Sequence, residues 1–257
     1  DELDLQGIYA EPAAQREYPA GAVAGNVVGF VGGEGHGLAG VELSMDSLLS
    51  GVDGEMACQL SAGGHCIPLG NGTRRAAVPG EGVRLTLDRD VQWYAEQALS
   101  RQVAAAGATA GNVVVMDTRT FEIVAMATAP AVDPNEPGAA ASDNRGNRAV
   151  EEAYEPGSVF KPLTMAAVIE EGKADPGTVL SVPDHVERSG EVINDYYEHG
   201  EEQMTLAGIL AKSSNVGTLL AAERIDKLVF RDRLVAFGIG TRPGLGLPGE
   251  SAGRLPA

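Results

Sequence analysis

The sequence predicts an α+β fold, in which helices and antiparallel strands occupy successive parts of the chain. A long helical pattern precedes two apolar segments around a short turn, and helical patterns dominate from there to the carboxyl end. A doubly wound parallel sheet would instead need strands and helices in regular alternation. With 257 residues, of which 44% are hydrophobic, the chain can bury a sizeable core.

The amino-terminal part of the chain, residues 1–82, is rich in glycine and has only short patterns. Residues 22–31 predict an extended segment that runs into a turn, whereas 41–49 have apolar side chains at helical spacing. A proline and two glycines in 73–82 indicate a linker. We therefore expect a small first domain over 1–82 and a second domain over 83–257.

The second domain opens with a period-two pattern over 83–88, which predicts a strand. Asp88 is then placed to cap a helix over 89–106, because its side-chain oxygens can accept from the first free N–H groups. Apolar segments at 111–117 and 121–127 flank a three-residue turn, and they predict a β-hairpin.

The charge of the chain excludes one class of partner. There are 19 basic and 36 acidic residues, a net charge of −17, and such a surface repels the phosphate backbone of nucleic acids. No apolar run approaches the roughly 18 residues of a transmembrane helix, and the chain opens Asp-Glu-Leu-Asp without a secretory leader. We interpret the sequence as a soluble fragment of a longer protein.

The two cysteines, Cys58 and Cys66, are separated by seven residues. They are close enough for a local disulfide in an extracytoplasmic protein, and they could equally be two unrelated small residues. A structural zinc site would need four ligands, and only His65 lies between the cysteines. The histidines lack metal-ligand spacing and are interpreted as loop or surface residues: His36, His65, His185 and His199.

The most informative segment is 154–161, which reads Tyr-Glu-Pro-Gly-Ser-Val-Phe-Lys. Its Pro-Gly turn signal precedes an apolar-periodic run over 159–169, so Ser158 lies at a helix amino terminus with Lys161 one turn further on the same face. A serine hydroxyl becomes a nucleophile when a base takes its proton, and a lysine with a lowered pKa can be that base. The helix terminus can stabilise an oxyanion.

A Ser-x-x-Lys pair alone is weak evidence, because about one occurs by chance in a chain of this length and a capping serine beside a solvated lysine explains it. This pair is the only one in the chain, although there are twelve serines. A second motif, Ser213-x-Asn215, is either a polar loop between helices or a second hydroxyl and an amide for the same site. Together the motifs are typical of penicillin-recognising serine enzymes.

On these motifs the region 148–217 resembles the transpeptidase domain of class B penicillin-binding proteins, the bacterial enzymes that cross-link peptidoglycan. The sequence is most similar to the septal, division-specific branch of this family, and the resemblance suggests an actinobacterial source. Segments outside this region also resemble the family: 85–88 and 114–127 are similar to the strands that open the domain, and 16–19 and 37–42 are similar to its amino-terminal pedestal.

The resemblance implies the penicillin-recognising serine transpeptidase fold, a helical subdomain plus an antiparallel sheet, truncated here and preceded by a small β-rich pedestal over 1–82. It implies that Ser158 is acylated, that Lys161 takes its proton and that Ser213 relays a proton to the leaving group. Asn215 would bind the peptide amide of the substrate, and the backbone N–H of Ser158 would supply half of the oxyanion hole. No cofactor or metal is implied.

The chain departs from the family pattern at its carboxyl end. None of its four lysines is followed by the Thr-Gly or Ser-Gly of the family's third motif. We therefore expect weak or absent turnover by this chain, and the alternative function is a non-catalytic scaffold of the cell-wall machinery. A β-lactamase or β-lactam sensor is disfavoured, because no Leu-Asn pair marks a deacylating glutamate segment.

The resemblance also implies where the protein acts and what it meets. The expected partners are the peptidoglycan stem pentapeptide, β-lactam antibiotics, a membrane glycan polymerase and other divisome proteins. The expected location is the extracytoplasmic face of the bacterial membrane, through an amino-terminal anchor that is absent from this chain.

Overall fold

A computed structural model describes residues 15–61, 66–68 and 74–255 and divides the chain into two compact units. Unit 1 runs to Glu151 and includes Gly244–Glu250, and unit 2 contains Glu152–Pro243 and the chain from Ser251. Every strand pairing in the described residues is antiparallel, and helices pack on the strands, which confirms the α+β class. The domain boundary between residues 82 and 83 falls inside unit 1 and stays a prediction, because compactness alone does not test it.

The first helices of unit 1 are short: α1 (Gly25–Val28), α2 (Gly40–Ser44) and α3 (Asp46–Leu49). The helical prediction over 41–49 is confirmed, whereas the extended segment predicted over 22–31 is wrong. The reason is tertiary: the buried Asn26 amide donates to the carbonyls of Asn144 and Gly146 at 2.8 and 2.7 Å. These bonds hold the chain in a helical turn that apolar spacing alone does not reveal.

The two segments that resemble the pedestal are in contact. Arg16 Nε donates to Glu42 Oε1 at 2.8 Å, and the Glu42 side chain is only 5% exposed. The backbone N–H of Val31 donates to the Tyr18 hydroxyl at 3.0 Å. An ion pair with one buried partner therefore ties the start of the described chain to α2.

Two small antiparallel pairs come next in the sequence, β1 (Glu55–Met56) with β4 (Arg74–Arg75) and β2 (Cys58–Leu60) with β3 (Cys66–Pro68). Cys58 is disulfide-bonded, and Cys66 is the other cysteine of the sequence. The side chain of Cys66 lies outside the described residues, so the pairing itself stays a prediction.

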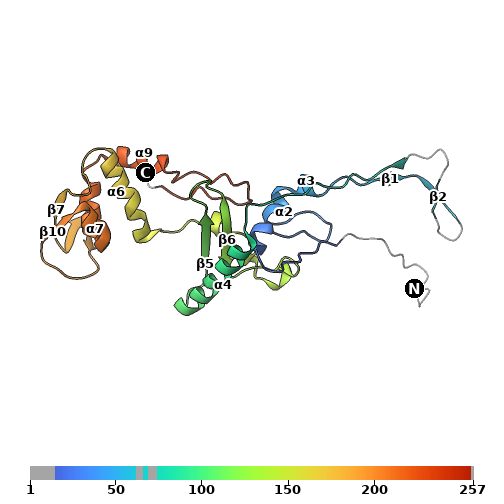
Figure 1. The fold of residues 1–257 in the computed structure, drawn as a ribbon, viewed down its shortest axis with the longest axis horizontal. Coiled ribbons are helices and arrows are strands. Elements are labelled where there is room, and N and C mark those ends of the chain that lie inside the picture. Colours follow the sequence, from blue (N-terminus) through green and yellow to red (C-terminus); the bar gives the residue numbers. More distant parts are fainter. Residues whose placement is uncertain (1–14, 62–65, 69–73, 256–257) are drawn as a thin grey trace. The chain divides into compact units, whose positions relative to one another are not determined.

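The main layer of unit 1 is a hairpin covered by one long helix (Figure 1). Helix α4 (Arg89–Ala106) begins at Asp88, whose side chain accepts from the N–H groups of Asp90 and Val91 as predicted. Strands β5 (Gly111–Met116) and β6 (Ile123–Ala129) form the predicted hairpin. Small side chains on β6 let the helix approach closely, and this cluster comprises Ala95, Leu99, Ala125, Ala127 and Ala129.

The strand predicted over 83–88 is wrong, because these residues join no sheet in the structure. Their alternation is real, since Leu85 and Leu87 pack against a core that contains Val27 and Met126. The period-two pattern therefore reflects an extended segment that buries one face, and it does not by itself indicate a strand. A strand would also need a ladder of backbone hydrogen bonds to a partner.

Unit 2 begins with the 3₁₀ turn η3 (Gly157–Phe160) and α6 (Lys161–Glu170), and contains α7 (Leu206–Lys212), α8 (Asn215–Ala222) and α9 (Lys227–Ala236). Two antiparallel strand pairs accompany these helices, β7 (Val179–Val182) with β10 (Glu202–Thr205) and β8 (His185–Arg188) with β9 (Glu191–Asn194). The sequence missed all four strands. Each has four residues with few buried side chains, which is too short for a clear alternation.

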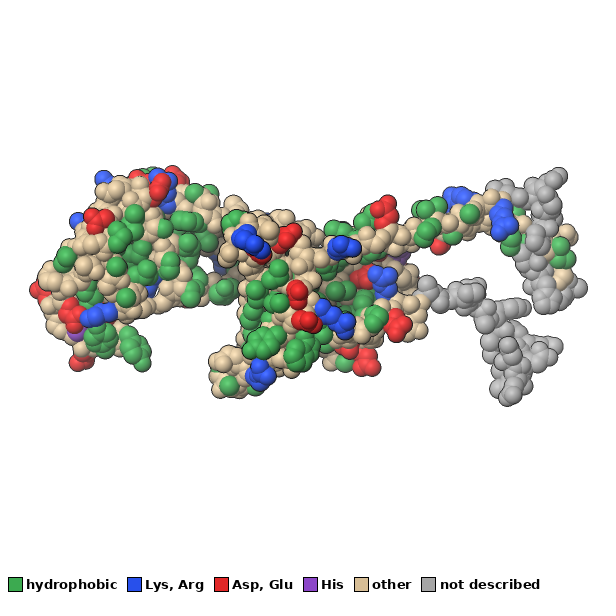
Figure 2. Space-filling view, viewed as in Figure 1, with side chains coloured by type: hydrophobic (Ala, Val, Ile, Leu, Met, Phe, Trp, Pro, Cys, Tyr) green, Lys and Arg blue, Asp and Glu red, His purple; other side chains and the backbone are tan. Residues whose placement is uncertain are grey.

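The core of unit 2 joins α6 to the strands and to the two helices that come after them. Its buried members are Met165, Ala167, Val168, Val182, Met204, Leu206, Ile209, Val216, Ala221 and Ile225. No helix in the described part of the chain has the length and apolarity to cross a membrane. On the face seen in Figure 2, acidic and basic side chains are interspersed, without a basic stripe that could track a phosphate backbone.

One buried side chain of α4 takes the place of a backbone partner for β6. Gln92 is 1% exposed; its Oε1 accepts from Met126 N at 2.7 Å and its Nε2 donates to Met126 O at 3.0 Å. Replacing Gln92 with Leu leaves both backbone groups buried without a partner, and we expect a loss of about 2–5 kcal/mol in the free energy of unfolding. Urea denaturation measures it. The exposed Gln97→Leu on the same helix is the control, and equal stabilities of the two variants would contradict the assignment.

Candidate active site

The predicted junction of turn and helix at Ser158 is confirmed. Gly157 has a φ of +60°, a left-handed conformation that favours glycine, and it leads into η3 and then α6. Ser158 is exposed, and its hydroxyl has no hydrogen-bond partner among the described residues. The nucleophile candidate is therefore open to a substrate at the amino-terminal end of the helix.

Lys161 is buried one turn after Ser158, with 8% of its surface exposed. Its Nζ donates to the carbonyl oxygen of Ser213, to Ser213 Oγ at 3.1 Å and to Asn215 Oδ1 at 2.7 Å. These three acceptors match the three N–H donors of an ammonium group. The structure thus brings together three of the four predicted residues, Lys161, Ser213 and Asn215.

Burial lowers the pKa of Lys161, and the negative charge of Asp195 opposes this shift in part. Desolvation disfavours the charged form of a buried amine. A lower pKa leaves more of the amine neutral near pH 7, with a lone pair that can accept a proton. The environment of Lys161 is therefore suited to a general base.

The turn between α7 and α8 presents Ser213 and Asn215 to this lysine. Ser213 ends α7 in the left-handed conformation, with φ 54° and ψ 37°, and its N–H donates to the carbonyl of Leu210 at 3.1 Å. This conformation costs a residue other than glycine about 1–2 kcal/mol. Ser214 then caps α8, since its Oγ accepts from Gly217 N at 2.8 Å. Two consecutive helix ends therefore fix the turn.

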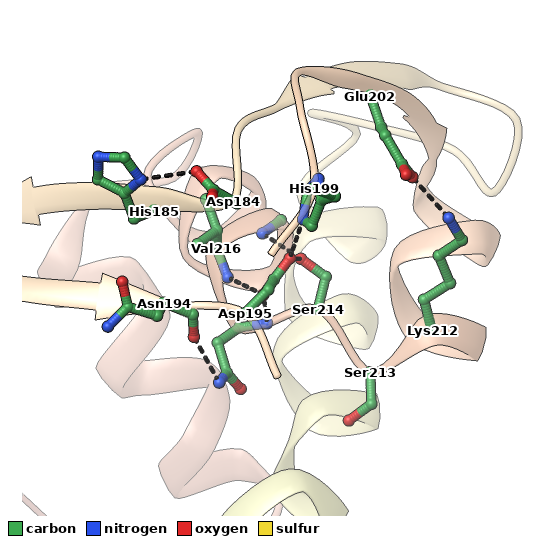
Figure 3. Close-up of polar contacts among 12 residues, drawn as sticks. Asp184, His185, Asn194, Asp195, His199, Glu202, Lys212, Ser213, Ser214 and Val216 are labelled. Atoms are coloured by element: carbon green, nitrogen blue, oxygen red, sulfur yellow. Dashed lines mark hydrogen bonds and ion pairs between the residues drawn. The ribbon is translucent and has the colours of Figure 1, made fainter. Parts of the chain in front are cut away.

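Asp195, just after β9, is a site residue that no sequence motif indicated (Figure 3). Its Oδ1 accepts from the backbone N–H groups of Asn215 and Val216 at 2.5 and 3.0 Å, and its Oδ2 accepts from Ser214 Oγ at 2.6 Å. Burial alone would raise the pKa of Asp195, but these hydrogen bonds and that from His199 lower it. Seventeen residues lie between Asp195 and Ser213, and no motif spacing links the two.

His199 lies in the loop between β9 and β10, as the interpretation of the four histidines as loop or surface residues allows, but its side chain is buried. Its side chain is 4% exposed, and its Nε2 lies 3.2 Å from Asp195 Oδ2. The histidines at 36 and 185 pair with aspartates while staying 70% and 65% exposed, as expected. His65 lies outside the described residues. The sequence around His199 is polar, Glu198-His199-Gly200-Glu201-Glu202, and only the fold shows that the histidine turns inward.

Among the described residues, no group of three histidine, cysteine, aspartate or glutamate side chains is arranged to hold a metal ion. The groups in the site are a hydroxyl, a buried amine, a second hydroxyl and an amide. Such a set can move a proton between oxygen and nitrogen and can form an ester at Ser158. This is chemistry for acyl transfer.

Comparison with known proteins finds relatives that cover nearly the whole of this chain. The family model for the penicillin binding protein transpeptidase domain matches residues 111–257. Penicillin-binding protein PbpB of Mycobacterium tuberculosis is 42% identical over 248 residues, 96% of this chain and 36% of that protein. A probable peptidoglycan D,D-transpeptidase, PenA of Neisseria meningitidis, is 37% identical over 98% of this chain and 43% of that protein.

A solved structure gives the same result. The crystal structure of penicillin binding protein 3 from Mycobacterium tuberculosis, complexed with aztreonam, matches with a TM-score of 0.82 and 40% identity, over 95% of this chain and 51% of that one. The chain thus spans less than half of the length of these two curated relatives and about half of this structure.

The backbone strain at Ser213 can be measured directly. Ser213→Ala and Ser213→Gly both remove the hydroxyl, but only glycine adopts the left-handed conformation without cost. We expect the glycine variant to be more stable by about 1 kcal/mol in chemical denaturation. Ser189 has the same φ of 54° in the exposed β8–β9 turn, and its alanine and glycine variants form the matched pair. No difference at Ser213, with a clear one at Ser189, would show that the α7–α8 turn is not strained.

Proposed function

This chain belongs to the penicillin-binding protein transpeptidase family, and we propose that the protein cross-links peptidoglycan stem peptides through an acyl-enzyme on Ser158. Membership of the family, and with it the transpeptidase fold, confirms the resemblance predicted from the sequence. One observation carries the proposal: the buried amine of Lys161 lies one turn after an exposed serine, in contact with Ser213 and Asn215.

The first step we propose is acylation. Neutral Lys161 takes the proton of Ser158 as Oγ attacks the carbonyl carbon of the penultimate D-alanine. The backbone N–H of Ser158, at the start of a helix, donates to the oxyanion that forms. The C–N bond then breaks, and the departing D-alanine amine receives a proton through Ser213, which lies 3.1 Å from Lys161 Nζ. An ester on Ser158 remains.

In the second step an acceptor amine of another stem peptide attacks the ester, gives its proton back through the same groups and releases Ser158. A β-lactam enters by the first step only: Ser158 opens the ring, but the amine stays tethered to the acyl group. Aztreonam bound in the structure of the Mycobacterium tuberculosis relative supports this inhibition.

Asn215 is proposed to bind the substrate amide. Its Oδ1 accepts from Lys161 and its Nδ2 donates to the carbonyl of Asn194 at 2.9 Å. An amide nitrogen has two hydrogens, so a second N–H of Nδ2 remains for a substrate carbonyl. Asn215 would thus orient both the base and the peptide.

The cellular setting is also a proposal. A mycobacterial relative at 42% identity supports an actinobacterial septal enzyme, and a disulfide at Cys58 is typical of an extracytoplasmic protein. We propose that the protein acts at the outer face of the membrane through an amino-terminal anchor. Its partners there would be a membrane glycan polymerase and other division proteins.

Intact-protein mass spectrometry after incubation with benzylpenicillin tests the nucleophile. We expect one adduct, mapped to Ser158, in the full-length protein and in the control Ser181→Ala, an exposed serine of β7. Ser158→Ala should give none, because the attacking oxygen is missing. An adduct that persists in Ser158→Ala would refute the assignment. No adduct in the unaltered full-length protein would favour the non-catalytic scaffold.

The role of Lys161 predicts a pH dependence. Because only the neutral amine accepts a proton, acylation should rise with pH on a limb below the ordinary lysine pKa of about 10.4. Lys161→Arg keeps the charge but cannot lose its proton, and we expect acylation to fall about 10²–10⁴-fold. Stopped-flow measurement with a fluorescent penicillin gives both rates. Lys173→Arg, at an exposed lysine, is the control, and an active Lys161→Arg variant would contradict the proposed base.

A further inference from the structure

His199 is held at both ring nitrogens by groups that only accept hydrogen bonds. Its Nδ1 lies 2.6 Å from the carbonyl oxygen of Gly200, and its Nε2 lies 3.2 Å from Asp195 Oδ2. A neutral imidazole has one N–H and would leave one nitrogen lone pair facing an oxygen lone pair. The geometry therefore fits the imidazolium form, in which both nitrogens donate.

The charged groups around His199 favour the same form. Asp195 faces its ring from the segment after β9, and Glu202 of β10 contributes a second negative charge. The Tyr197 ring lies 5.1 Å away, centroid to centroid, and Lys212 of α7 forms an ion pair with Glu202 at 2.5 Å, which offsets part of the negative charge of Glu202. Burial opposes the charge of His199, but its hydrogen bonds and the two carboxylates outweigh burial and raise its pKa.

Asp195 connects this histidine to the catalytic turn. Each carboxylate oxygen accepts two hydrogen bonds: Oδ1 from the N–H groups of Asn215 and Val216, and Oδ2 from Ser214 and His199. Its side chain is 3% exposed, so its charge needs a compensating partner. Asp195 therefore holds the segment that directly follows Ser213. Both Ser213 and Asn215, which is part of that segment, contact Lys161.

We propose that His199 is a positioning residue of the active site. As an imidazolium it fixes Asp195, and Asp195 holds the Ser214–Val216 segment so that Ser213 and Asn215 meet Lys161. This inference rests on the proposed function for its kinetic consequence. Because the raised pKa of His199 keeps the ring charged below that pKa, the pairing is lost as pH rises through it. Acylation should therefore have a falling limb set by His199 beside the rising limb set by Lys161.

The kinetic test is a double-mutant cycle in the full-length protein. Acylation by a fluorescent penicillin is measured from pH 5 to 9 for the unaltered protein, His199→Gln, Asp195→Asn and the double variant. We expect His199→Gln to lower the rate about tenfold at pH 6 and to remove the falling limb. In the Asp195→Asn background the same change should have little further effect. His185→Gln, which removes an exposed histidine paired with Asp184 at 2.6 Å, is the control and should keep both limbs.

Two results would overturn the inference: a wild-type pH profile in His199→Gln, or rate losses that multiply in the double variant. Failure of the proposed function is distinct, because the unaltered protein would then show no acylation on Ser158. A measurement on the unaltered protein needs neither activity nor a variant. ¹⁵N NMR of the histidine-labelled chain should show the His199 ring more than half protonated at pH 6.5, where an ordinary histidine is half protonated, and a mostly neutral ring there would refute the proposal.

Discussion

The site depends on one constraint, the burial of the Lys161 amine against oxygen atoms of a single turn. A buried amine must be neutral or well paired, and here the same contacts provide pairing for the charged form while burial favours the neutral form. Three helices of unit 2 support this contact: α6 carries the lysine, α7 ends and α8 begins at the turn, and the three share one apolar core.

Asp195 contributes a negative charge that stabilises the same turn. It is a carboxylate at the amino terminus of α8, where free N–H groups and the helix dipole favour negative charge, so the helix and the acid stabilise each other. The acid also lies near enough to Lys161 to oppose the lowering of its pKa. A stronger negative field at this place would hold the lysine protonated, and a weaker one would loosen the turn.

Local rules predicted part of this fold from the sequence, whereas features that depend on tertiary placement were missed. The capped helix α4, the β5–β6 hairpin and the junction at Ser158 are set by periodicity, caps and turn residues, and the structure confirms them. The Ser-x-x-Lys and Ser-x-Asn motifs identified the family, while the roles of their residues stay proposals. Asp195 and His199 could not be found, because their importance lies in what they face across the fold. The four short strands of unit 2 were missed because short half-exposed strands carry too little apolar pattern.

Ser213 has a consequence for engineering this protein. Its backbone conformation makes glycine the residue that folding would select at that position, while the proposed proton relay needs a hydroxyl. Directed evolution that screens for heat resistance alone would therefore drift toward glycine here and yield a robust but chemically impaired catalyst. Stability and the proposed activity therefore favour different residues at position 213, and a library built for thermal tolerance should keep Ser213 fixed.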